Sequence, residues 1–274
     1  MLVAFDFGIT NTDVVVNDSG RNKFFTFPSQ PVNNKFLDDI INSIEINLAN
    51  ISKIAVTGGK SNDLGASYKK IPIIKINEVD AIGYGAIALY DIIDRPFIVV
   101  SAGTGTACIY HNNGNFNYLG GIAVGGGTLQ GLTQHLIKNK NFNEIEQLAK
   151  SGDRKKLDYL ISDVVNEIGS LDPGITASNF GKAKDFDKLS HNDIAISISN
   201  MIGEVIGTVA YLNAFLIGSD AAYFTGRTSY LSEIMNGINQ RLDIAGVKAK
   251  YSDNREYANA IGVLEKIKNF TKLN

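Results

Sequence analysis

Residues 2–17 read LVAFDFGITNTDVVVN, and this stretch decides the fold. Its first six residues are apolar apart from Asp6, and residues 12–17 are rich in β-branched side chains. The pattern predicts a buried strand, a tight turn at residues 8–11, and a second strand that returns beside the first. An acid at the end of a strand, followed by a glycine turn, is therefore the first candidate site.

Within this turn, Gly8 lets the backbone approach a ligand closely, and Thr10 adds a hydroxyl group. Backbone N–H groups in such a turn bind phosphate oxygens, and a carboxylate such as Asp6 can hold a hydrated Mg²⁺. A plain β-turn closed by an Asx hydrogen bond has the same composition. The turn alone leaves both interpretations open.

The order of strand, glycine turn and strand occurs a second time. Residues 97–101 predict a strand that is apolar up to Val100, Gly103-Thr104-Gly105-Thr106 forms the turn, and residues 107–110 predict the returning strand. A hairpin turn at residues 112–114 and a further strand at 115–119 follow. We interpret the recurrence as an internal duplication, in which the second turn also binds phosphates.

Three consecutive glycines and a threonine, Gly125, Gly126, Gly127 and Thr128, precede a helical pattern over residues 129–137. The free N–H groups and the dipole at a helix start form an anion site. Simple N-capping by Thr128 is the alternative. We favour the ligand site, because three glycines cost more conformational entropy than a cap requires.

A carboxylate pair, Glu78 and Asp80, starts a predicted helix over residues 78–89, directly after an apolar strand at 71–76. A carboxylate there can act as general base on a substrate hydroxyl. Negative charge at a helix N-terminus is also favourable by itself. The local sequence does not choose between these roles.

Apolar periodicity predicts the other elements of an α/β chain. They are helices over residues 34–48, 128–150, 193–217 and 257–270, and strands over 23–28, 54–57 and 221–224. The apolar stretch 196–217 is interrupted by polar residues, so we expect a buried helix and not a membrane span.

Composition excludes several classes of protein. The chain has 274 residues, and its 44% hydrophobic and 20% charged residues are typical of a globular protein, which excludes disordered and fibrous classes. The net charge of −2 indicates no basic surface for nucleic acid. A single cysteine, Cys108, excludes an intramolecular disulfide framework. The N-terminus has no signal-peptide pattern, so we expect no membrane association and a cytoplasmic location.

Taken together, these segments resemble the type II (eukaryotic-like) pantothenate kinase family, within the acetate and sugar kinase and actin-like ATPase superfamily. The most specific matches are the GGGTLQGL segment at residues 125–132 and the ASNFG segment at 177–181. Further matching landmarks are Asp6-x-Gly8-x-Thr10, Thr57-Gly58-Gly59, Glu78-Val79-Asp80, the Gly103–Thr106 turn, Leu119-Gly120-Gly121 and Gly152-Asp153-Arg154.

The resemblance implies an α/β fold of two actin-like (ribonuclease H-like) lobes with a nucleotide cleft between them. It implies lobes over residues 1–95 and 96–256, with the C-terminal helix at 257–274 packed on the first.

The resemblance also implies an ATP-dependent kinase for a primary alcohol, namely pantothenate, at the first step of coenzyme A biosynthesis. Glu78 is then the general base and Asp6 the Mg²⁺ ligand. The ATP-binding residues are Asp6, Gly8, Thr10, Gly103, Thr104, Gly105, Thr106, Gly125, Gly126, Gly127 and Thr128. The family is homodimeric through a long apolar helix, a role that residues 196–217 fit, although an ordinary core helix fits them equally.

Four residues depart from the family pattern. Ile9 replaces a glycine of the first turn, and Asp13 stands where a lysine is expected. In the acceptor site, which the family match places at Ala107, Tyr118 and Gly121, Ala107 replaces a serine and Tyr118 an arginine. Losing the arginine removes a fork of hydrogen-bond donors and adds a stacking surface.

These departures leave three hypotheses. The chain is a pantothenate kinase that uses another donor, such as Lys60 or Arg154. It is a kinase for a related small alcohol, such as pantetheine or pantoate. Or it is a nucleotide-binding pseudokinase. The retention of Glu78 argues against this third hypothesis, and the loss of the cationic partners argues for it.

Overall fold

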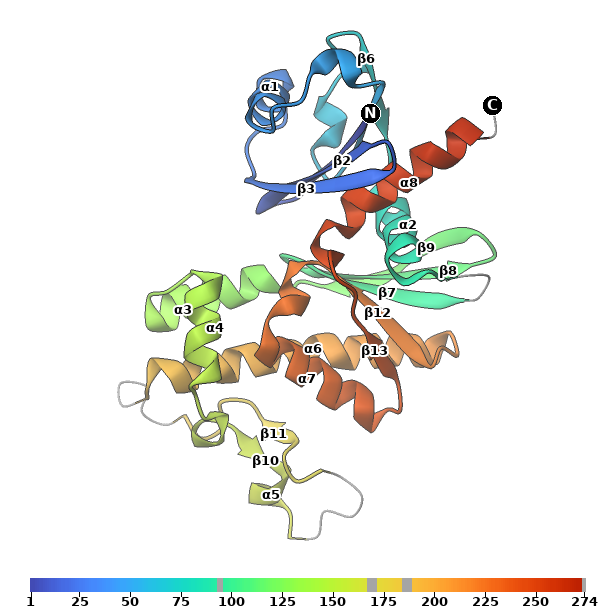
Figure 1. Cartoon of the computed structure of the whole chain (residues 1–274). Helices are drawn as coiled ribbons and strands as arrows, with labels where there is room; N and C mark the ends of the chain where they lie inside the picture. Colours follow the sequence, from blue (N-terminus) through green and yellow to red (C-terminus); the bar gives the residue numbers. More distant parts are fainter. Residues whose placement is uncertain (93–95, 167–171, 184–188, 273–274) are drawn as a thin grey trace. The chain divides into compact units, whose positions relative to one another are not determined.

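A computed structural model describes residues 1–92, 96–166, 172–183 and 189–272, and they form two compact units (Figure 1). Unit 1 comprises residues 1–99, 109–118 and 251–274, and unit 2 comprises residues 100–108 and 119–250. The predicted lobe boundary at residue 95 lies outside the described residues. Residues 96–99, 109–118 and 251–256, which the prediction places in the second lobe, belong to unit 1.

The sheet of unit 1 confirms the opening strand, turn and strand. Its strand order is β3-β2-β1-β4-β6-β5, with β1 antiparallel to β2 and parallel to β4. The strands are β1 (Leu2–Phe7), β2 (Asn11–Asp18), β3 (Arg21–Pro28), β4 (Lys53–Thr57), β5 (Ser67–Tyr68) and β6 (Ile71–Lys75).

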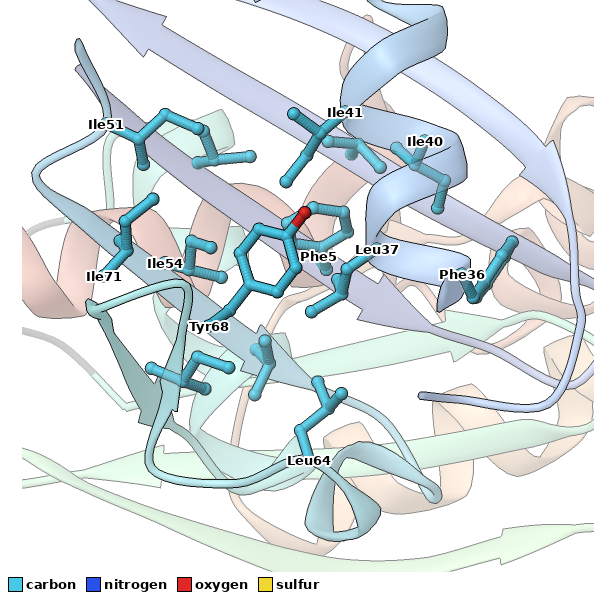
Figure 2. Packing of buried hydrophobic residues seen from close by; sticks show 14 of the residues in the cluster. Phe5, Phe36, Leu37, Ile40, Ile41, Ile51, Ile54, Leu64, Tyr68 and Ile71 are labelled. Atoms are coloured by element: carbon cyan, nitrogen blue, oxygen red, sulfur yellow. The ribbon is translucent and has the colours of Figure 1, made fainter. Parts of the chain in front are cut away.

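One face of this sheet is covered by α1 (Asn34–Ser43). Figure 2 shows Tyr68 among the side chains of Leu37, Ile41 and Ile54 in this core. The helix is shorter than the predicted 34–48. It ends because Glu45 adopts a left-handed conformation with φ 54°, which turns the chain out of the helix.

The other face of the sheet packs on α2 (Glu78–Tyr90) and α8 (Ala258–Lys272), which lie side by side (Figure 1). The two helices approach closely at two glycines. A Cβ on Gly85 would lie 2.0 Å from the Ala258 carbonyl oxygen, and one on Gly262 would lie 1.9 Å from that of Ala81. This face carries small side chains, among them Ala4 and Ala55.

A second sheet has the order β13-β12-β7-β8-β9. Its strands are β7 (Phe97–Ala102), β8 (Thr106–Asn112), β9 (Asn115–Ile122), β12 (Ala221–Thr225) and β13 (Lys248–Lys250). Read from β9, this order repeats that of β3-β2-β1-β4-β6, which supports the inferred duplication. β7, β8 and β9 contribute residues to both units. The β8–β9 turn is the predicted hairpin, with positive φ at Asn113 and Gly114.

The end of the β8–β9 hairpin packs within unit 1, which explains the division of the chain. Phe116 contacts Tyr84 of α2 with ring centroids 5.0 Å apart, and His111 stacks on Phe97. Gly83 leaves room for the Phe116 ring, since a Cβ there would lie 2.2 Å from it. Aromatic packing therefore ties residues 109–118 to α2.

Unit 2 is built around one long helix, α6. Its helices are α3 (Gly126–Ile137), α4 (Phe142–Lys150), α5 (Ile161–Val164), α6 (His191–Leu216) and α7 (Ser232–Ile244), with short strands β10 (Tyr159–Leu160) and β11 (Thr176–Ser178). α7 packs along α6 (Figure 1), where Gly203 and Gly207 let the backbones approach. By length and composition α6 could cross a membrane, but 67% of its most apolar window is buried inside the protein. A buried core helix gives the same signal.

Candidate active site

The candidate residues of unit 1 gather at one edge of its sheet. β1, β4 and β6 are parallel neighbours, so their carboxyl ends meet at this edge. Asp6 lies near the end of β1, Thr57 ends β4, and Glu78 starts α2 directly after β6. In open α/β sheets, ligands bind outside the carboxyl ends of parallel strands.

The turn from Gly8 to Thr10 is exposed, as a ligand-binding turn must be. Gly8 is required there, because a Cβ would lie 2.7 Å from the Asn11 carbonyl oxygen. Ser29 holds the turn from β3's side: its Oγ donates to the Gly8 carbonyl at 2.6 Å, and its N–H donates to the Thr10 carbonyl at 3.1 Å. Ser29 was not predicted from the sequence, because it lies beyond the strand pattern that identified the turn.

Asp6 has a strongly perturbed environment. Burial, together with the negative charges of Asp13 and Glu78, raises the pKa of its carboxyl group to about 7. A hydrogen bond from Asn259 Nδ2 to Asp6 Oδ2, 3.1 Å long, acts in the opposite direction. Such perturbed carboxyl groups concentrate at functional sites.

The two carboxylates at the start of α2 have different surroundings. Asp80 accepts a hydrogen bond from Asn77 Nδ2 at 2.8 Å and forms an ion pair with Lys266 of α8. Glu78 is exposed and accepts no hydrogen bond from any described residue. Asp80 is therefore engaged with the N-cap residue Asn77 and with Lys266, whereas the Glu78 side chain is exposed. The role of Glu78 as general base stays a prediction.

In unit 2, the turn at Gly103–Thr106 and the start of α3 lie against each other. Gly126 N–H donates to the Gly103 carbonyl, and Gly127 N–H donates to the Thr104 carbonyl, both at 2.9 Å. A Cβ on Gly125 would lie 2.7 Å from both carbonyl oxygens. The structure thus brings two predicted phosphate-binding segments together.

The same contacts correct one expectation. We expected free N–H groups at the start of α3, but those of Gly126 and Gly127 are already bonded to the neighbouring turn. Thr128 is not the N-cap either: α3 begins after Gly125, and Thr128 Oγ1 accepts from the Gly125 N–H at 3.3 Å. The glycines are needed for the close approach of two backbones, a requirement that the sequence alone does not reveal.

Two further residues complete this part of unit 2. Thr106 is buried, and its Oγ1 donates to the Val124 carbonyl at 2.8 Å. Thr228 Oγ1 donates to the Gly103 carbonyl at 2.7 Å. Gly226, at the end of β12, has φ 86° and lies so close to β7 that a Cβ would be 2.4 Å from the Ala102 carbonyl oxygen.

Gly226 and Thr228 were missed as site residues, yet the sequence holds a signal for them. Thr57–Ser61 reads TGGKS and Thr225–Ser229 reads TGRTS. In both segments the serine Oγ donates to the glycine carbonyl, at 2.8 Å in Ser61 and 2.7 Å in Ser229. The TGxxS turn therefore occurs at the same point of each sheet.

The predicted acceptor residues lie on two neighbouring strands, Ala107 on β8 and Tyr118 and Gly121 on β9. Tyr118 is 59% exposed, so its ring is open to a ligand. Lys60 is exposed, whereas Arg154 is engaged in the protein: it donates to Thr176 Oγ1 and to the Gly174 carbonyl, both at 2.6 Å. Arg154 is therefore part of the unit 2 framework and not a free donor.

The residues around Asp6 suit Mg²⁺. Among the described residues there is no group of three or more His, Cys, Asp or Glu side chains that could hold a metal ion. Mg²⁺ in kinases does not need such a cage, because one or two carboxylates, waters and substrate phosphates complete its coordination. Asp6, with Asp13 beside it, supplies the hard oxygen ligands that this ion prefers.

Solved structures with the same fold define the class. The activator of 2-hydroxyisocaproyl-CoA dehydratase from Clostridium difficile, with bound ADPNP, superimposes with a TM-score of 0.65, at 16% identity and covering 100% of this chain and 97% of that one. A ROK family glucokinase from Streptomyces griseus, in complex with glucose and AMPPNP, gives 0.58 at 12% identity, covering 97% and 98%. The chain has the α/β fold of actin-like ATPases and sugar kinases.

Sequence comparisons narrow the class to one family. The family model described as Fumble matches residues 90–245. The type II pantothenate kinase of Bacillus anthracis is 32% identical over 237 residues, which are 82% of each chain. Pantothenate kinase 2 of Arabidopsis thaliana is 36% identical over 141 residues, 48% of this chain and 16% of that protein. The chain belongs to the type II pantothenate kinase (Fumble) family.

Proposed function

We propose that this protein is an ATP-dependent kinase that phosphorylates the primary alcohol of pantothenate. Its family membership supports this function, and one structural observation carries it. Glu78, at the carboxyl edge of the unit 1 sheet, is an exposed carboxylate with no hydrogen-bond donor among the described residues. A carboxylate left free in this way can accept the proton of an attacking hydroxyl.

We assign the other predicted residues to ATP and Mg²⁺. Asp6 holds Mg²⁺, which neutralises charge on the phosphates, and the turn at Gly8 and Thr10 contacts phosphate oxygens. The turn at Gly103–Thr106 and the Gly125–Thr128 segment contact the nucleotide with their glycine backbone and their threonine hydroxyls. In phosphoryl transfer these groups position the reactants and stabilise charge, and Glu78 directs the acceptor oxygen.

We also propose that the protein is a homodimer and acts in the cytoplasm, where its nucleotide substrate is available. Three apolar side chains at the end of α6, Leu212, Phe215 and Leu216, are each more than half exposed. Grouped apolar exposure of this kind marks a protein interface. A second copy of this chain is the partner that the family resemblance implies.

The test is product formation by purified protein with ATP and Mg²⁺. Pantothenate, pantetheine and pantoate are supplied separately, and ADP and the phosphorylated acceptor are both measured. We expect phosphorylated pantothenate as the main product. Phosphorylation of another acceptor alone would show that Ala107 and Tyr118 have changed the substrate. ATP binding without any phosphorylated acceptor would show a pseudokinase.

A further inference from the structure

A row of four oxygen-bearing side chains crosses the sheet of unit 1. In the strand register, Thr26 on β3 lies opposite Asp13 on β2, Asp13 lies opposite Asp6 on β1, and Asp6 lies opposite Thr57 on β4. Register partners on adjacent strands project from the same face of a sheet, with Cβ atoms about 5 Å apart. The row is thus one continuous band of hydroxyl and carboxylate groups.

The face that carries the row is the one covered by α2 and α8. The next register row on this face lies two positions along each strand and consists of Val15, Ala4 and Ala55. These side chains belong to the apolar core under the two helices. α8 supports the row directly, because its Asn259 donates to Asp6. Tyr257, the residue before α8, has its hydroxyl oxygen 3.1 Å from Thr26 Oγ1. The oxygen atoms are therefore held in place by the protein.

Two carboxylates of this row lie side by side in a partly buried position. Asp13 is only 7% exposed, and its Oδ1 accepts from Thr26 Oγ1 at 2.6 Å. Its charge and that of Glu78 both act on Asp6. Like charges this close are unfavourable in a protein interior, and a cation that binds both relieves the repulsion.

Thr57 supplies an independent indication of a ligand. Its side chain is fully buried, and its Oγ1 has no hydrogen-bond partner among the described residues. Buried hydroxyl groups are normally hydrogen-bonded, so an unsatisfied one next to a carboxylate indicates a bound ion or water. Threonine hydroxyls bind Mg²⁺ in other nucleotide-binding proteins.

We infer that Asp13 and Asp6, with the Thr57 hydroxyl, form a divalent-cation site that binds Mg²⁺ before the nucleotide arrives. The inference extends the proposed use of Mg²⁺ with ATP. It assigns Asp13, which stands where the family pattern has lysine, to the metal. A lysine there would contribute positive charge itself, whereas in this chain the metal ion contributes it.

The test measures binding of Mn²⁺, a paramagnetic substitute for Mg²⁺, to the full chain without nucleotide or acceptor, by electron paramagnetic resonance. We expect one bound ion in the wild-type protein. Replacing a charged ligand weakens divalent-cation sites strongly, so Asp13→Asn should raise the Kd about tenfold or more. Thr57→Val should weaken binding more than Thr57→Ser, which keeps the hydroxyl.

Asp18→Asn is the matched control, because Asp18 is an exposed residue at the other end of β2 and its substitution changes the net charge equally. Thermal unfolding of each variant verifies that it is folded. No Mn²⁺ binding by the wild-type protein without nucleotide would overturn the inference. So would equal binding by Asp13→Asn and Asp18→Asn. Because no phosphoryl transfer is measured, these results are independent of whether pantothenate is the acceptor.

Discussion

Asn259 of the C-terminal helix donates a 3.1 Å hydrogen bond to Asp6 of the first strand, although 253 residues separate them in the sequence. This contact joins α8 to the carboxylate that we assign to Mg²⁺. It also lowers the pKa of Asp6, against the larger effect of burial. α8 therefore has a role at the site as well as in the core.

The first prediction concerns this contact. Asn259→Ala removes a donor to a charged group, and such hydrogen bonds contribute about 1.5–3 kcal/mol. We expect the KM for Mg²⁺ to rise about tenfold with a smaller change in kcat, because Asp6 loses orientation and charge stabilisation. Asn236→Ala, which removes an exposed amide that donates to Glu233, is the control. Equal KM values for Mg²⁺ in the two variants would refute the role of Asn259 in holding Asp6 for the metal ion.

The second prediction is a pH dependence of stability. The pKa of Asp6 is about 7 in the folded protein, against an ordinary value of 3.8. Between pH 3.8 and pH 7, Asp6 binds a proton in the folded state but not in the unfolded state. The contribution of protonated Asp6 to the free energy of unfolding is therefore complete below about pH 3.8. This contribution is lost as the pH rises through about 7.

This prediction is measured by thermal unfolding in EDTA at pH 5.5 and pH 8. Asp6→Asn carries no charge at either pH, so its Tm should fall less than that of the wild-type protein over this interval. Mg²⁺ should raise the Tm of the wild-type protein at pH 8 and have little effect on the variant. Parallel pH profiles of the two proteins would contradict the assignment.

The third prediction concerns Gly226, at the turn after β12. Its φ of 86° and ψ of 156° are accessible almost only to glycine, and a Cβ would collide with the Ala102 carbonyl. We expect Gly226→Ala to lower the free energy of unfolding by about 3 kcal/mol, and to weaken ATP binding by shifting the neighbouring turn.

The control for Gly226 is Gly246. It has φ 66°, but a Cβ there meets no atom within 4 Å. Gly246→Ala should cost only the backbone strain, about 1 kcal/mol. Urea unfolding of both variants measures the difference. If the two variants lost the same free energy of unfolding, the close approach of the backbone at Gly226 to Ala102 would not explain why glycine is needed there.

The fourth prediction concerns the buried carboxylate of Glu204, which contacts the ASNFG segment. Asn179 of that segment donates to Glu204 Oε2 at 3.1 Å, and Arg241 pairs with Glu204 Oε1 at 3.3 Å. Glu204 is buried on α6, so Arg241→Met leaves a buried charge without its cation and should cost about 3 kcal/mol. Lys150→Met, at the exposed lysine of a pair with Glu146, should cost less than about 1 kcal/mol. Denaturant unfolding measures the free energy that each of the two variants loses. Equal losses would show that Arg241 does not stabilise the buried charge of Glu204.

Much of the fold could be predicted from the sequence because it depends on local patterns. The apolar run ending at Asp6 and the β-branched run after Asn11 are β1 and β2, and the Asn113-Gly114 turn is a hairpin. The family was also recognisable from short, ordered landmarks. Helix ends were less predictable: α1 stops at Ser43 because Glu45 takes a left-handed conformation, although apolar residues continue beyond it.

The parts of the site that were missed depend on contacts between distant segments. Asn259 and Ser29 carry no local motif, and each acts through a partner elsewhere in the chain. Thr228 lies in a TGxxS turn, but its acceptor, the Gly103 carbonyl, is 125 residues away. The paired N–H groups of Gly126 and Gly127 were unpredictable for the same reason, since their acceptors lie on the Gly103–Thr106 turn. By contrast, Glu78 and Asp80 were both candidates in the sequence, and they differ in the structure because Asp80 is bonded to Asn77 and Lys266. The role of Glu78 as general base stays a prediction.

The most direct test of the proposed function compares Glu78→Gln with Asp80→Asn in single-turnover transfer of phosphate from ATP to pantothenate. If Glu78 is the general base, Glu78→Gln should slow the transfer about 10²- to 10⁴-fold while ATP still binds. Asp80→Asn should retain most of the rate, because Asp80 is engaged with Asn77 and Lys266. A wild-type rate in Glu78→Gln, or a larger loss in Asp80→Asn, would contradict the account.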